Sequence, residues 1–168
     1  MDDILSTGEY TRDGQDNPGL IAPPPLIYAG ALLTGLILNW VFPIRLLSKR
    51  TQGTRLTIGV ICVGLAFTVV RGAFQQMRTA KTNVNPTLPT LAIVTGGPYQ
   101  VTRNPIYLSL TLLYAGLSLL LNTFWTMLLL PFVLFVMNRG VIDREEQYLE
   151  RKFGEQYLRY KRSVGRWF

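Results

Sequence analysis

The sequence of 168 residues contains no histidine and only one cysteine. Without histidine, the chain cannot build a Ser-His triad, a His-ligated zinc site or a haem site with a histidine ligand. The cysteine, Cys62, cannot form an internal disulfide, and it lies in an apolar run between Ile61 and Val63. Such surroundings are typical of a small buried hydrophobic residue rather than of a nucleophile.

Carboxylates are also missing from the middle of the chain. Residues 1–22 and residues 139–168 each hold five of the ten Asp and Glu residues, so residues 23–138 hold none, although they carry eight Lys or Arg. Any carboxylate that takes part in chemistry must therefore come from the N-terminal arm or from the segment after the last apolar run. The net charge of +7 accompanies several apolar segments, which favours anionic lipid head groups over nucleic acid as partners.

The composition favours a membrane protein with a single domain. Only 16% of the residues are charged, 48% are hydrophobic, and the mean hydropathy is positive. Residues 1–22 are polar and show no periodicity, so they are interpreted as a flexible N-terminal arm. Residues 23–168 are then expected to form one membrane domain.

The apolar segments predict an all-α integral membrane fold with about four transmembrane helices, near residues 26–47, 56–74, 106–121 and 124–138. A turn at Asn122-Thr123 joins the last two into a helical hairpin over residues 106–138. Each arm has only about 15 residues, or roughly 23 Å, which is short for a hydrocarbon core of about 30 Å. A proline inside the second arm, Pro131, is expected to kink it.

The positive charges do not give a single topology. Residues 75–105 and the tail carry an excess of Lys and Arg, which predicts a cytoplasmic location for both. With four spans, the loop after the first segment then lies outside, yet it contains Arg45, Lys49, Arg50 and Arg55. Either these side chains snorkel to the interface, or one of the four segments does not cross the bilayer.

The tail after residue 139 has the pattern of an amphipathic helix, with Gly154 expected to break or bend it. Its Glu146 falls on the otherwise apolar side. One interpretation is a helix that lies on the membrane with Glu146 at its edge, and the other is a carboxylate with a polar partner or ligand. At 100° per residue, one side of the helix gathers Ile142, Glu146, Leu149, Phe153, Tyr157 and Tyr160.

Two polar blocks, residues 96–107 and 143–149, bracket the apolar hairpin. Because a tight hairpin returns the chain to the side from which it started, the two blocks are expected to meet at one membrane face. Arg103 is the charge nearest to the hairpin on the first block. It could pair with a lipid phosphate, with a carboxylate ligand, or with Glu145 or Glu146 of the second block.

Four motifs in this order carry a family resemblance: Gly97-Pro98-Tyr99, Arg103-Asn104-Pro105-Ile106-Tyr107, the segment 145–149, and the segment 153–160. Together they make the second half of the chain similar to the isoprenylcysteine carboxyl methyltransferase family of integral-membrane methyltransferases, in its bacterial form. The resemblance extends more distantly to the phospholipid N-methyltransferases. It implies S-adenosylmethionine as methyl donor, bound by the part of the chain from about residue 84 to residue 168.

Carried over by position, the resemblance implies a site at the cytoplasmic face of a bacterial inner membrane, with a lipid or isoprenoid acceptor entering from between the helices. Arg103 and Glu146 are the expected catalytic residues, no metal is expected, and Arg159 and Arg162 are expected nearby. The implied cofactor-binding residues are Gly97, Tyr99, Arg103, Asn104, Tyr107, Glu145, Glu146 and Tyr160.

Asn104 stands where eukaryotic members of the resembled family typically have histidine. An asparagine keeps a hydrogen-bond donor and acceptor but cannot exchange a proton near neutral pH. A role in holding the cofactor is therefore compatible with Asn104, whereas a role as base is not. Asn104 could instead simply cap the helix that starts at Pro105.

Two other functions remain open from the sequence. One is an NADPH-dependent membrane sterol or enone reductase, which has a similar membrane architecture and binds a nucleotide cofactor near its tail. The other is a non-catalytic membrane scaffold whose basic tail binds anionic lipid, in which Glu145 and Glu146 are dispensable. The pair of carboxylates and the small size favour the methyltransferase, whose acceptor group could be a carboxylate, a thiol or an amine.

Overall fold

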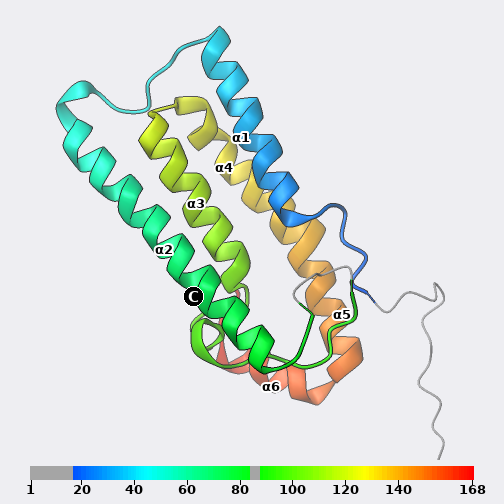
Figure 1. Cartoon of the computed structure of the whole chain (residues 1–168). Helices are drawn as coiled ribbons and strands as arrows, with labels where there is room; N and C mark the ends of the chain where they lie inside the picture. The colour runs from blue at the N-terminus through cyan, green and yellow to red at the C-terminus, as the bar shows by residue number, and fades with distance from the viewer. Residues whose placement is uncertain (1–16, 84–87) are drawn as a thin grey trace, which may run out of the picture.

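The computed structural model describes residues 17–83 and 88–168, and within these ranges the regular structure is entirely helical. The expected all-α fold is confirmed (Figure 1). The α-helices are α1 (Pro24–Val41), α2 (Gln52–Thr79), α3 (Pro105–Leu121), α4 (Phe124–Met137), α5 (Asp143–Phe153) and α6 (Glu155–Ser163). Three short helices, η1 (Lys49–Thr51), η2 (Gly97–Gln100) and the π-helical η3 (Asn138–Ile142), connect them.

α3 lies at the centre of the bundle, packed along α2 on one side and against α4 and α1 on the other. Figure 1 shows α5 and α6 gathered at one end of the bundle, below the N-terminal end of α3. The opposite end holds the turn between α3 and α4 and the loop after α1. The polar segments that flank the hairpin therefore share one end of the molecule.

The chain is an integral membrane protein by the length and surface of its helices. α1, α2 and the helical run Phe124–Phe153 are each long and apolar enough to cross a membrane, and α3 is a shorter apolar helix of 17 residues. Their outward surface is formed by large apolar side chains, which lipid can cover. The most exposed of them on these helices are Trp40, Leu26, Phe132, Phe67 and Ile37.

Two helix boundaries differ from the sequence prediction. α1 ends at Val41 rather than near residue 47, because Pro43 disfavours the helical conformation of Phe42, whose φ is −126° and ψ 85°. α2 continues to Thr79 rather than ending near residue 74. The polar last turns of α2 contact the rest of the chain, because Gln76 packs against Gly96 and Gly97 at the start of η2.

The predicted hairpin is confirmed, with its turn at Asn122-Thr123. Asn122 adopts the left-handed conformation with φ 53° and ends α3, a role that asparagine tolerates well. Its side chain also bonds the loop after α1: Leu47 N–H donates to Asn122 Oδ1 at 3.0 Å, and Asn122 Nδ2 donates to the Leu47 carbonyl at 3.1 Å. The turn is therefore held by a segment 75 residues away in the sequence.

The second arm of the hairpin, α4, ends at Met137, close to the predicted residue 138, but no loop follows it. α4 runs through Pro131 and continues through the π-helical turn η3 directly into α5, so that Phe124–Phe153 is one helical run of 30 residues. The π turn buries Gly140, Val141 and Ile142. The acidic residues of α5 are consequently attached to a membrane helix without an intervening loop.

The structure explains one of the four basic residues, Arg55, that make the topology of the first loop ambiguous. Arg55 is buried, only 8% exposed, and its Nη1 donates to the carbonyl oxygens of Leu119 and, at 2.8 Å, of Leu120. These are carbonyls of the last turn of α3, where a helix leaves acceptors for other groups, and Leu119 O also accepts the Asn122 N–H at 3.1 Å. Arg55 therefore caps α3, and only Arg45, Lys49 and Arg50 of this loop remain exposed.

The N-terminal arm lies largely outside the described residues, and its last described part contacts the bundle. Gly19 accepts a hydrogen bond of 2.8 Å from Arg144 Nη1 on α5. Ile21 packs on Gly140 of the π turn and donates its N–H to the Gly140 carbonyl at 3.4 Å. Gly140 thus leaves room for a side chain from the segment that precedes α1.

Close packing of α2 on α3 gives a first prediction. A Cβ at Gly116 would lie 2.9 Å from Val63 Cγ2 and 3.0 Å from the Gly59 carbonyl, whereas a Cβ at Gly64 would meet nothing within 4 Å. We expect Gly116→Ala to destabilise the protein by about 1–3 kcal/mol through overpacking. Gly64→Ala should leave the thermal midpoint in detergent unchanged or raise it, because alanine favours helix. Equal midpoints for the two variants would contradict the close packing.

Candidate functional site

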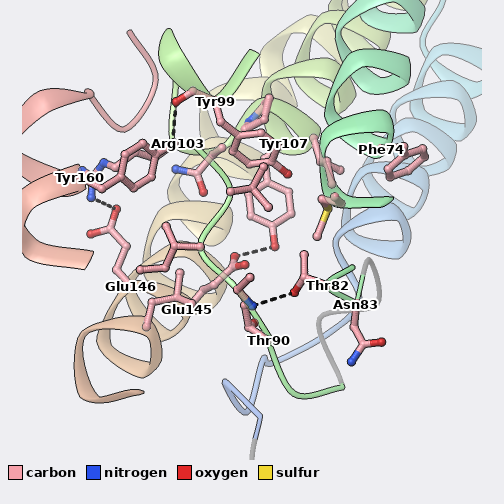
Figure 2. A pocket seen from close by; sticks show the side chains of 18 of the residues that line it. Phe74, Thr82, Asn83, Thr90, Tyr99, Arg103, Tyr107, Glu145, Glu146 and Tyr160 are labelled. Atoms are coloured by element: carbon pink, nitrogen blue, oxygen red, sulfur yellow. Dashed lines mark hydrogen bonds and ion pairs between the residues drawn. The ribbon is translucent and has the colours of Figure 1, made fainter. Parts of the chain in front are cut away.

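A cavity of about 240 Å³ opens between the N-terminal end of α3, the C-terminal end of α2 and α5 (Figure 2). This volume is slightly below the range of roughly 300–1,000 Å³ for small-molecule pockets. Residues of the membrane helices form an apolar wall: Pro24, Pro25, Phe74, Met77, Ile106 and Leu110. Polar side chains form the opposite wall: Tyr99, Arg103, Asn104, Tyr107, Glu145, Glu146, Tyr157 and Tyr160.

Five short segments place the polar side chains, and one of them is α6, which carries Tyr157 and Tyr160. Tyr99 lies on η2, Arg103 and Asn104 directly precede α3, and Tyr107 is in the first turn of α3. Two further positions, Glu145 and Glu146, are in the first turn of α5, continuous with the π turn. The meeting of the two polar blocks at the base of the hairpin is therefore confirmed.

Glu146 is buried, with 6% of its side chain exposed, and it has three cationic neighbours. Arg166 binds it in two places, Nε to Oε1 at 3.0 Å and Nη2 to Oε2 at 2.8 Å. Lys161 Nζ lies 3.5 Å from Oε2, and Arg103 Nη1 lies 3.1 Å from Oε1. The cost of burying this carboxylate is thus offset by several cations, which is the condition under which buried charge is tolerated.

Arg103 is also buried, with 9% of its side chain exposed. Although its Nη1 is within ion-pair distance of Glu146, neither Nε nor Nη1 makes a hydrogen bond to any described residue. Buried guanidinium donors without hydrogen-bond partners are costly. Arg103 lines the cavity, so an anionic group bound there would lie next to this guanidinium.

Glu145 has a different environment from Glu146. Its Oε2 accepts a hydrogen bond of 2.8 Å from the Tyr107 hydroxyl, and it forms no ion pair within the described residues. Figure 2 shows the Tyr107 hydroxyl and the Glu145 carboxylate pointing toward one another. Glu145 therefore presents a carboxylate without a counter-ion to the cavity, which favours a cationic group there.

The tyrosines of the polar wall are hydrogen-bond donors at physiological pH. Burial raises the pKa of Tyr157 to about 12, and burial raises the pKa of Tyr160 and of Tyr99 well above the usual range. The Tyr160 hydroxyl donates to the Tyr99 carbonyl at 2.7 Å, joining α6 to η2. These phenols therefore position segments around the cavity and do not act as bases.

The connection between α2 and η2 contributes the outer edge of the cavity. Thr82, after the end of α2, accepts the N–H of Leu91 at 2.9 Å. Thr90 donates its N–H to the Tyr148 hydroxyl of α5 at 3.2 Å. These two hydrogen bonds tie the connection to α2 and α5, and residues 84–87 lie outside the described ranges.

Seven of the eight expected cofactor-binding residues line the cavity, and Gly97 does not. Gly97 has φ 57° and packs on Gln76, so it shapes η2. Arg159 and Arg162, expected nearby, are exposed and lie outside the cavity lining. Arg162 pairs with Glu155 at 2.5 Å on the surface of α6.

The expected helix cap at Asn104 is wrong. Asn104 occupies the N-cap position of α3, but its side chain makes no capping hydrogen bond there. Its Nδ2 instead donates to the Arg166 carbonyl at 3.0 Å, because the segment after α6 lies directly against it. Sequence reasoning missed Arg166 and Lys161 as partners of Glu146, since both follow the Gly154 break and no pattern indicates where α6 lies.

Comparison with known proteins gives the family. The model of the phospholipid methyltransferase family matches residues 54–156, which is more than half of the chain. The chain therefore belongs to the phospholipid methyltransferase family, and the resemblance to membrane methyltransferases is confirmed.

Two relatives illustrate the similarity. An uncharacterized protein of Haemophilus influenzae is 44% identical over 62 residues, which cover 37% of this chain and 98% of that protein. The protein-S-isoprenylcysteine O-methyltransferase of Schizosaccharomyces pombe is 30% identical over 112 residues, 64% of this chain and 45% of that enzyme. The match thus spans less than half the length of the yeast relative. No solved structure matches the chain.

Proposed function

We propose that the chain is an S-adenosylmethionine-dependent methyltransferase that methylates a lipidic or isoprenoid acceptor. The observation that carries the proposal is a cavity lined by Arg103 and Glu145. Among the described residues, Nε and Nη1 of Arg103 have no hydrogen-bond partner and the Glu145 carboxylate has no counter-ion. A ligand with both a negative and a positive group complements these two side chains. Membership of a methyltransferase family agrees with a methyl donor of this kind.

The residues present fit S-adenosylmethionine. Arg103 can hold its carboxylate in a charge-assisted pair, and Glu145 can hold a cationic group, the ammonium or the sulfonium. When bound, the cofactor supplies an activated methyl group on a sulfonium. The chain then has to bind and orient the reactants and exclude water, and placement of this kind is itself a large contribution to rate.

The apolar wall supports an acceptor with an apolar body. Phe74 and Met77 from α2 and Ile106 and Leu110 from α3 line the cavity at the base of the membrane bundle. A hydrophobic chain lying among the helices would bring a polar end group to the polar wall. The segment 75–105 carries no carboxylate and has Arg78, Lys81 and Arg103, which supports a cytoplasmic location at a bacterial inner membrane.

The demand for a base depends on the acceptor group. A carboxylate acceptor needs no deprotonation, whereas an amine or a thiol does. Asn104 cannot provide this function, and both oxygens of Glu146 already accept hydrogen bonds from Arg166. Glu145 is the carboxylate placed to accept such a proton, while the catalytic role expected of Glu146 stays a prediction.

The proposal is tested by calorimetry on the purified full chain in detergent, with S-adenosylmethionine and NADPH as ligands. We expect binding of S-adenosylmethionine and none of NADPH. Absence of S-adenosylmethionine binding at millimolar concentration would overturn the proposal. Binding of NADPH alone would indicate a reductase, and binding of neither ligand a non-catalytic lipid-binding scaffold.

Glu145→Gln provides a prediction at the same site. The amide oxygen can still accept the hydrogen bond from Tyr107, so the substitution mainly removes negative charge from the cavity. We expect affinity for S-adenosylmethionine to fall about tenfold, a loss of roughly 1.4 kcal/mol. The matched control is Glu155→Gln, which changes an exposed glutamate of α6 paired only at the surface. Equal affinities for the two variants would place the cationic group of the ligand away from Glu145.

A further inference from the structure

Residues 164–167, here named the strap, follow α6, and they lie against the segment that precedes α3. Carbonyl oxygens of the strap accept three hydrogen bonds from the segment before α3. Arg103 N–H donates to Gly165 O at 3.0 Å, Thr102 Oγ1 to Arg166 O at 2.9 Å, and Asn104 Nδ2 to Arg166 O at 3.0 Å. The backbone that carries Arg103 is thus held by the strap.

The side chains of the strap contact the helical run on the other side. Arg166 binds Glu146 through two hydrogen bonds and also lies 2.9 Å from Asp143 Oδ1. Trp167 Nε1 donates to Asn138 Oδ1 of the π turn at 3.2 Å, and its ring packs against the core cluster of the bundle. One short segment therefore joins the loop before α3, the π turn and α5.

Because Arg166 binds Glu146, it affects how the Arg103 guanidinium can pair with the same carboxylate. Both oxygens of Glu146 accept hydrogen bonds from Arg166. Arg103 is within ion-pair distance of Glu146, but its Nε and Nη1 form no hydrogen bond in the part of the chain that the structure describes. If the Arg166 side chain were absent, Glu146 would be open to a bidentate pair with Arg103, the geometry that guanidinium and carboxylate prefer. Arg103 would then have fewer donors for a ligand.

We propose that Arg166 is a positioning residue of the binding site, which occupies Glu146 so that Arg103 keeps its donors free for the anionic group of the ligand. The identity of that ligand rests on the proposed function, and the role of the strap in holding the Arg103 segment does not. Arg166 does not line the cavity, so it acts through Arg103 and Glu146.

Binding measurements test the proposal. In calorimetry with S-adenosylmethionine, Arg166→Gln should raise Kd about tenfold. Arg166→Lys, which keeps the charge but loses the two parallel bonds, should lie between the wild type and Arg166→Gln. The matched control, Arg162→Gln, removes an arginine of the same tail from an exposed pair with Glu155 and should leave Kd unchanged. An unchanged Kd in Arg166→Gln, with wild-type binding intact, would overturn the positioning role.

A double-mutant cycle separates positioning from general loss of structure. If Arg166 acts through Arg103, then Arg166→Gln should have little further effect on Kd in an Arg103→Gln background. Additive effects would overturn the proposal, because they would mean that Arg166 affects binding independently of Arg103. The thermal midpoint of each variant, measured in parallel, identifies any loss that comes from unfolding.

Amide hydrogen exchange tests the positioning role of Arg166 without a ligand. In the free protein, Arg166→Gln should accelerate amide exchange in peptides covering residues 99–107 and 143–150, and Arg162→Gln should not. Unchanged exchange in residues 99–107 would overturn the proposal even if the protein bound S-adenosylmethionine. If the wild type failed to bind S-adenosylmethionine while exchange rose in these peptides, the proposed function would fail and the positioning of Arg103 by the strap would stand.

Discussion

Replacement of Arg103 by glutamine should weaken binding of S-adenosylmethionine by roughly 30- to 150-fold, or about 2–3 kcal/mol. Arg103 is buried at the cavity and has two nitrogens, Nε and Nη1, without hydrogen-bond partners among the described residues. Hydrogen bonds from such donors to a carboxylate are charge-assisted and formed away from water, where they are strongest. Calorimetry on the purified variant measures the loss.

The fold should survive this substitution, because Glu146 keeps Arg166 and Lys161 as partners. The thermal midpoint in detergent checks this point. The matched control is Arg159→Gln, which removes an exposed arginine of α6 that does not line the cavity. If both variants bound S-adenosylmethionine with wild-type affinity, the free donors of Arg103 would have no contact with the methyl donor.

Glu146→Gln should produce the largest loss of stability, about 3–5 kcal/mol. The carboxylate is buried, and it is the sole carboxylate within ion-pair distance of Arg103 in the described part of the chain. Arg166 would keep Asp143 and Lys161 would keep Glu150, but Arg103 would become a buried cation without a counter-ion. Such an uncompensated charge is more costly than the loss of a surface pair.

The measurement is the thermal midpoint of the full chain in detergent, and Glu155→Gln serves as control. Glu155 pairs with Arg162 on the exposed surface of α6, so its substitution should leave the midpoint at the wild-type value. A midpoint for Glu146→Gln equal to that of the control would show that the cations around Glu146 do not depend on its charge.

The sequence predicted the parts of the fold that depend on local chemistry. The lengths of the apolar runs located α3 and α4, and Asn122, which tolerates a left-handed conformation, marked their turn. The meeting of the two polar blocks followed from the geometry of a hairpin, whereas the choice of Glu146 as the partner of Arg103 did not. The break at Gly154, which has φ 52°, was also predictable from residue type.

The parts that could not be predicted depend on contacts distant in the sequence. Arg55 is one of several loop cations by its sequence, and its use as a cap for α3 requires α2 and α3 to be packed together. Asparagine often caps helices, yet the side-chain amide of Asn104 donates its hydrogen bond to the Arg166 carbonyl instead. The pairing of Arg166 with Glu146 depends on the direction that the chain takes after Gly154. The hydrophobic pattern of the sequence does not indicate this direction.

The continuity of α4, the π turn and α5 has a mechanical consequence. Since Phe124–Phe153 is one helical run, a change in the tilt of its apolar part is expected to move its polar end as well. Apolar helices adjust their tilt to the thickness of the surrounding bilayer. Glu145 belongs to this run, whereas Tyr107 belongs to the neighbouring helix α3. Lipid chain length is therefore expected to act on the hydrogen bond between Tyr107 and Glu145, which joins two membrane helices at their polar end.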